Sequence, residues 1–69
     1  MMIKLSEVGS DPNEVWLNTS LISSVLEPSG QEQDMGIGAK IYIIGEEDVP
    51  WLVRESVREV IDLIERASR

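Results

Sequence analysis

Apolar and polar residues alternate in two short segments near the start of the chain. Residues 2–6 (Met-Ile-Lys-Leu-Ser) and residues 14–18 (Glu-Val-Trp-Leu-Asn) both show this pattern. A period of two is typical of a β-strand with one buried face, because successive side chains of a strand point to opposite faces. Residues 8–13 between them are rich in turn-forming residues, so the two segments are predicted to form a hairpin.

The middle of the chain holds further apolar segments around a stretch without periodicity. Residues 39–44 are almost continuously apolar and β-branched, which is typical of a central strand covered on both faces. Residues 23–27 and 49–54 are predicted to be additional short strands. The Gly-rich residues 28–38 show no period and are predicted to be a mobile acidic loop.

A C-terminal helix is predicted over residues 56–68. Ser56 and Glu59 have the spacing of a capping box, in which each side chain accepts a hydrogen bond from the backbone N–H of the other residue. The apolar residues that follow form one stripe at helical spacing: Val57, Val60, Ile61 and Ile64, widened by Leu63.

A shorter helical turn is predicted where the second strand ends. The side chain of Asn18 can accept a hydrogen bond from a backbone N–H two or three residues further on, which favours such a turn. The turn is expected to bury Leu21 and Ile22.

Together these elements predict one α+β domain spanning residues 1–69. Its expected architecture is a small antiparallel β-meander of four to five strands, with the amphipathic helix packed on one face. A chain of this length buries only about 60% of the surface that its unfolded form exposes, so its core is marginal. It contains no cysteine and therefore no disulfide. Because small domains commonly gain stability by association, we expect a protein partner or a homo-oligomer.

The distribution of charge narrows the choice of partner. The net charge is −7, and residues 1–53 carry nine acidic side chains against two basic ones, Lys4 and Lys40. Binding to nucleic acid or to an anionic membrane surface needs clustered lysine and arginine, which this chain lacks. No apolar run is long enough to span a bilayer, and the first residues lack the features of a signal peptide. We therefore expect a cytoplasmic protein without membrane insertion.

The side chains available for catalysis are few. The chain contains no histidine, which removes the commonest general base and the commonest transition-metal ligand. Serines are plentiful, but a nucleophilic serine needs a base. The acidic residues 46–48 lack the spacing of a calcium loop, and residues 36–38 lead into a strand rather than into the helix that a phosphate loop requires. We expect no enzymatic activity, no metal or other cofactor, and no small-molecule substrate.

A second apolar face of the sheet is the main candidate for function. Trp16 lies opposite Val15 and Leu17, which the alternation assigns to the face that the helix covers. The same reasoning places further apolar side chains on the other face, so the candidate interface is Trp16, Tyr42, Ile44 and Leu52. A monomer rarely exposes such a patch, which would therefore mark a protein interface. The alternative interpretation places Trp16 in the core.

Four blocks of sequence resemble the small FlbD-type flagellar proteins. They are Met2-Ile3-Lys4-Leu5, then Val15-Trp16-Leu17-Asn18 with Leu21-Ile22, then Ile41-x-Ile43 with Gly45, and finally Val53-Arg54-Glu55-Ser56 with Glu59-Val60-Ile61. The resemblance implies a fold of the predicted kind and a non-enzymatic accessory role in motility. Residues 28–38 depart from the family by replacing a brief turn, and residues 46–48 are acidic where the family tends to carry lysines. A function that depends on those lysines would not carry over.

Two hypotheses for function follow. The first is a non-enzymatic protein–protein interaction module that serves as a flagellar accessory protein of the FlbD type. The alternative is a phage-borne or orphan structural protein that builds rings through the edges of its sheet. A small DNA-binding regulator is disfavoured by the acidic charge.

Overall fold

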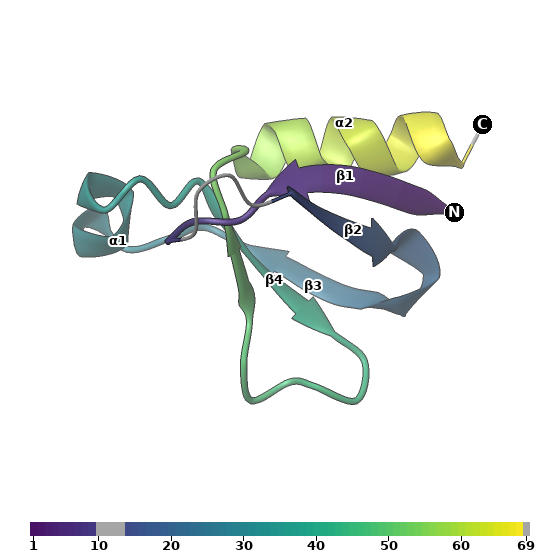
Figure 1. The fold of residues 1–69 in the computed structure, drawn as a ribbon, viewed down its shortest axis with the longest axis horizontal. Coiled ribbons are helices and arrows are strands. Elements are labelled where there is room, and N and C mark those ends of the chain that lie inside the picture. Colours follow the sequence, from purple (N-terminus) through teal and green to yellow (C-terminus); the bar gives the residue numbers. More distant parts are fainter. Residues whose placement is uncertain (10–13, 69) are drawn as a thin grey trace.

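The computed structural model describes residues 1–9 and 14–68, which form five strands, a 3-10 turn and two helices (Figure 1). The elements are β1 (Met2–Ser6), β2 (Glu14–Asn18), η1 (Thr19–Leu21), β3 (Ile22–Leu26), α1 (Gly30–Asp34), β4 (Ala39–Ile43), β5 (Trp51–Val53) and α2 (Val57–Ala67). The α+β class predicted from the sequence is confirmed. The tip of the predicted hairpin turn, residues 10–13, lies outside the described residues.

The strands form two antiparallel sheets rather than one continuous meander. β1 pairs with β2, so that Ile3 lies opposite Leu17, and β4 lies between β3 and β5, so that Ile41 lies between Val25 and Trp51. The consecutive strands β2 and β3 do not pair, because η1 turns the chain between them. The turn that connects β4 to β5 projects on the side of the molecule away from α2 (Figure 1).

The two sheets meet at the end of β1. The backbone N–H of Val8 donates to the carbonyl oxygen of Leu52, and that of Arg54 donates to the carbonyl oxygen of Ser6, both at 2.8 Å. The carboxylate of Glu55 completes this corner, since it accepts from the backbone N–H of Ser6 at 2.9 Å and from its hydroxyl at 3.1 Å. These contacts hold the segment that leads into α2 against β1.

The core lies between the two sheets and α2, which runs beside β1 (Figure 1). Its buried cluster is Ile3, Leu5, Leu17, Ala39, Ile41, Ile43, Val53 and Val60. Alternate residues of β1 and of β4 enter this cluster, as their sequence patterns predict, because the side chains of a strand alternate between its faces.

The helix α2 confirms the predicted capping box. The Ser56 hydroxyl accepts from the backbone N–H of Glu59 at 3.1 Å, and the Glu59 carboxylate accepts from the backbone N–H of Ser56 at 3.0 Å. Val60 is buried, but Ile61 is 40% exposed, so its assignment to the buried stripe is wrong. The face of α2 that packs on the core is centred on Val60 and Ala67, and Ile61 lies at the edge of this face.

The segment predicted to be a loop at residues 28–38 contains the short helix α1. Ser29 and Glu32 form a second capping box, with hydrogen bonds of 2.7 and 3.2 Å. The helix ends with the two bonds of a Schellman motif, which run from the N–H groups of Gly36 and Ile37 to the carbonyl oxygens of Gln33 and Glu32. Ile37 is only 3% exposed, which anchors the segment to the rest of the domain. The absence of a period in the sequence predicts a loop without a helix, which is wrong for Gly30–Asp34. The mobility of the segment stays a prediction.

The predicted cap at the end of β2 is also present. The side-chain oxygen of Asn18 accepts from the backbone N–H of Ser20 at 3.0 Å, and η1 follows. Leu21 is nevertheless 46% exposed, so the expectation that this turn buries it is wrong. The turn is only three residues long and lies at the margin of both sheets, where Leu21 meets a groove instead of the core.

Candidate functional site

Three of the four residues of the predicted interface lie on two different sheets, and Ile44 lies in the turn after β4. Trp16 and Ile44 are the most exposed of them, at 57% and 56%, so Trp16 is not a core residue. Tyr42 and Leu52 are half-buried on the outer face of the three-stranded sheet, where Tyr42 pairs with Ser24 and Leu52 pairs with Lys40. The structure therefore brings Trp16 together with Ile44, and it leaves Tyr42 and Leu52 on a separate surface.

Trp16 and Ile44 line a groove of about 530 Å³ between the end of the first sheet and the turn after β4. We call it the apolar groove. Its lining residues are Met2, Trp16, Leu17, Asn18, Leu21, Ile43, Ile44, Gly45, Glu46 and Trp51. Four of these side chains (Met2, Trp16, Leu21 and Ile44) are both large and exposed, so the groove presents apolar surface to solvent.

Local structure explains why the groove forms at this place. The backbone N–H of Ile44 donates to the carbonyl oxygen of Leu21 at 2.7 Å, which fixes η1 beside the end of β4. Gly45 has a φ of +92°, a backbone conformation that side chains disfavour, and it turns the chain sharply away from the sheet. Trp16 of β2 and Ile44 after β4 remain exposed at this place, whereas Leu17 and Ile43 beside them are buried.

A second hollow of about 460 Å³ adjoins the apolar groove. It is lined by Glu7, Glu46, Asp48, Val49, Pro50 and Trp51, and we call it the acidic hollow. Glu46 and Trp51 line both hollows, which makes them two parts of one surface. The sequence-predicted interface does not include Trp51, which is partly buried against the core and also lines both hollows. It is the first residue of the three-residue strand β5, and a strand end next to Pro50 was the available signal that it lies at the margin of the sheet.

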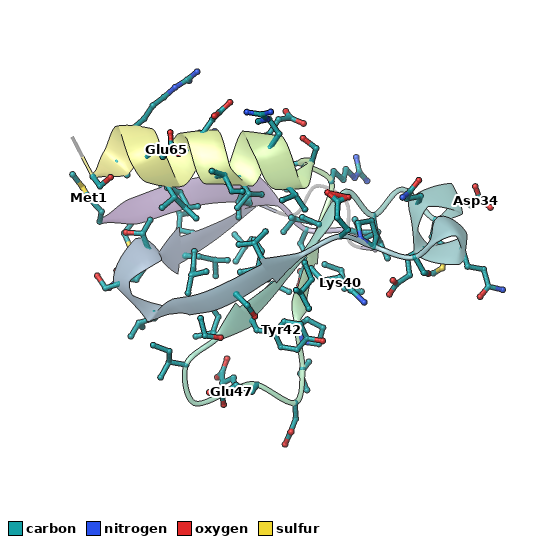
Figure 2. All side chains as sticks on the ribbon, turned by 180° about the vertical axis from the view of Figure 1, so that it is seen from behind. Met1, Asp34, Lys40, Tyr42, Glu47 and Glu65 are labelled. Carbon is teal, nitrogen blue, oxygen red and sulfur yellow. The ribbon has the colours of Figure 1, made fainter. Side chains whose placement is uncertain are left out.

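The charge on this surface has one sign. Within the described part of the chain, no lysine or arginine lines either hollow. Lys40 lies 3.2 Å from Glu32 and Lys4 lies 4.0 Å from Glu14, both on other parts of the molecule. Figure 2 shows Glu47 on the turn that borders the hollows, whereas Glu65 lies at the opposite side, on α2.

The carboxylates with displaced pKa values lie elsewhere and have structural roles. The backbone N–H of Ser29 lowers the pKa of Glu32, helped by a hydrogen bond from Lys40. The backbone N–H of Ser56 and its hydroxyl lower the pKa of Glu59 in the same way. Both are capping residues, and neither lines the two hollows.

The combined surface offers side chains suited to non-covalent contacts. Its side chains are apolar groups, indole rings and carboxylates, which form hydrophobic contacts, cation–π contacts and ion pairs. Over residues 1–9 and 14–68, no group of three or more potential metal ligands gathers. In the same residues, no helix is both long and apolar enough to cross a membrane.

No family model, curated protein or solved structure matches this chain. The resemblance to FlbD-type proteins therefore rests on the quoted sequence blocks, and the role that it implies stays a prediction.

Proposed function

We propose that this protein is a non-enzymatic protein–protein interaction module that binds its partner in the apolar groove. The observation that carries the proposal is the exposure of Trp16 and Ile44 on one groove, beside Met2 and Leu21. Tryptophan is the residue most enriched among those that dominate binding energy, and contiguous exposed apolar surface is typical of docking sites.

The exposed part of Trp16 is large enough to matter for binding. A tryptophan side chain buries 150–250 Å² when it is fully covered, and 57% of Trp16 is still accessible. At about 25 cal/mol per Å², covering it contributes about 2–4 kcal/mol to association. A few such side chains are sufficient for a specific complex, because most binding energy resides in a small number of residues.

The biological setting that we propose is that of a cytoplasmic flagellar accessory protein. It is supported by the sequence blocks that resemble FlbD-type proteins, which include Trp16 and Leu21 of the groove. The homo-oligomer expected from the small size of the domain stays a prediction, and the mass of the protein in solution tests it.

The function is tested by comparing Trp16→Glu with Ile61→Glu. Both variants place a carboxylate at an exposed apolar position, but Ile61 lies on α2, outside the groove. The immobilised wild type and each variant are incubated with an extract of the source cell, and the retained proteins are identified. We expect a partner that the wild type and Ile61→Glu retain and Trp16→Glu loses. Equal retention by all three folded proteins would refute a role for the groove.

A further inference from the structure

The apolar groove and the acidic hollow form one largely apolar surface, and its carboxylates gather at the hollow. Trp51 and Glu46 line both, so a ligand that fills the groove reaches the hollow without leaving the protein surface. The groove half holds the apolar side chains of Trp16, Leu21 and Ile44. The hollow half combines three carboxylates with three apolar side chains: Glu7, Glu46, Asp48, Val49, Pro50 and Trp51.

Two carboxylates of the acidic half, those of Glu46 and Asp48, are available to a ligand. Glu46 and Asp48 lie on the exposed turn between β4 and β5, and neither forms an ion pair with a base in the described residues. The chain as a whole carries a net charge of −7. A surface of this kind attracts a ligand of opposite sign and repels one of the same sign.

We propose that the surface recognises a protein segment that combines an apolar anchor with a neighbouring lysine or arginine. This inference rests on the proposed function and specifies the chemistry of the partner. The apolar side chain enters the groove beside Trp16, and the cation enters the hollow, where Glu46 and Asp48 pair with its charge. The indole of Trp51 contributes a cation–π contact, which is strongest for tryptophan among the aromatic residues.

The same charges argue against a second copy of this chain as the occupant. A two-fold dimer uses the same surface patch on both subunits, so the acidic hollows of the two copies would be brought together. Like charges that face each other across an interface oppose association and select against the wrong partner. A segment with positive charge has the opposite effect.

The test uses three short synthetic peptides of equal length and the whole protein. One peptide alternates leucine and lysine, the second alternates leucine and glutamate, and the third alternates serine and lysine. We expect the wild type to bind the Leu–Lys peptide at least roughly tenfold more tightly than the other two, because only that peptide serves both halves of the surface. Raising the salt concentration from about 0.01 M to about 1 M weakens this binding, since it shortens the range of the charge attraction.

Charge reversals on the protein locate the binding. The double variant Glu46→Lys, Asp48→Lys is expected to lose roughly tenfold in affinity for the Leu–Lys peptide at low salt. The single variant Asp48→Lys is expected to lose roughly threefold. Glu65→Lys makes the same change in net charge on α2 at the far side of the molecule, so it is the matched control of that single variant and is expected to change the affinity by less than about twofold. Equal effects of the two single variants, or equal binding of the Leu–Glu peptide, would overturn the proposal.

The outcome also separates this inference from the proposed function. If the double variant still captures the natural partner while Trp16→Glu loses it, the interaction function stands and the requirement for a cation is refuted. If light scattering shows a dimer for the wild type and a monomer for Trp16→Glu, the occupant is a second copy of the chain. That result would refute the proposal that a basic protein segment occupies the surface, while the groove would remain an interaction surface.

Discussion

Gly38 lies where the start of β4 passes closest to another part of the backbone. Its N–H donates to the carbonyl oxygen of Val53 at 2.7 Å. A Cβ atom at this position would fall on the carbonyl oxygens of Arg54 and Glu55, which belong to the main chain and cannot rotate away as a side chain can. Gly38→Ala therefore requires the backbone after β5 to shift.

The magnitude of the effect follows from what that shift would disturb. Inserting one methyl group into a closely packed site typically costs 1–3 kcal/mol. The displaced segment also carries the hydrogen bonds of Arg54 and Glu55 to Ser6, each worth about 1 kcal/mol. We expect Gly38→Ala to reduce the free energy of unfolding by about 2–4 kcal/mol, which for a domain of this size lowers Tm by roughly 10–30 °C.

The chain offers a matched control at Gly30. This residue is the first of α1, and a Cβ atom built on it meets nothing within 4 Å. Gly30→Ala is expected to leave the stability unchanged or to raise it by about 0.4–1 kcal/mol, because alanine restricts the unfolded chain. Urea unfolding followed by tryptophan fluorescence measures both variants. If Gly38→Ala proves as stable as Gly30→Ala, the close approach of β4 to the segment after β5 is wrong.

Three further predictions concern stability. Ile41→Ala removes a fully buried side chain between β3 and β5 and should cost about 2–5 kcal/mol in a urea titration; a loss below about 1 kcal/mol would contradict its place in the core. Glu55→Ala removes the carboxylate that accepts hydrogen bonds from the N–H and the hydroxyl of Ser6, so the free energy of unfolding should fall by about 1–3 kcal/mol. Glu65 lies outside this corner, and Glu65→Ala should change that free energy by less than about 0.5 kcal/mol. Glu32 and Glu59 have lowered pKa values in the folded protein, so the stability that they contribute is present above the ordinary glutamate pKa of about 4.3 and is lost as the pH falls through their lowered values. The Glu32→Gln, Glu59→Gln double variant should therefore lose less stability than the wild type on acidification, as measured by thermal unfolding from about pH 6 to about pH 3; an identical loss in both proteins would contradict this role.

The regular elements could be predicted because their patterns extend over enough residues to define a period. The strands at residues 2–6 and 14–18 and the helix that begins after Ser56 are present as expected. The helix α1 is too short to show a period, although Ser29 and Glu32 have the spacing of a capping box and Gly36 stands where such a helix ends. The Ser29 and Glu32 spacing and Gly36 favour a short helix, but the absence of apolar periodicity over residues 28–38 led to the prediction of a loop.

The candidate site could be predicted only in part, for a geometric reason. Alternation correctly placed Trp16 away from the core, because it depends on one strand alone. It cannot say which outward-facing residues of different strands meet, since that depends on how the two sheets are oriented. Tyr42 and Leu52 therefore do not line the groove with Trp16, whereas Trp51, which the predicted interface does not include, reaches it from the end of a short strand.

The corner formed by Ser6 and Glu55 has a consequence for how the protein is made. These residues are 49 positions apart, and their contact, with the backbone bonds beside it, joins the pair of β1 and β2 to the segment that leads into α2. Contacts of such long sequence separation form late and slowly, because most of the chain must be ordered before they close. β1 can pair with β2 early, but a ribosome has to release the segment around Glu55 before the corner at Ser6 can close. Until then Ile3 and Leu5 are open to chaperones and proteases, and any premature stop before that segment leaves a product that cannot complete its core.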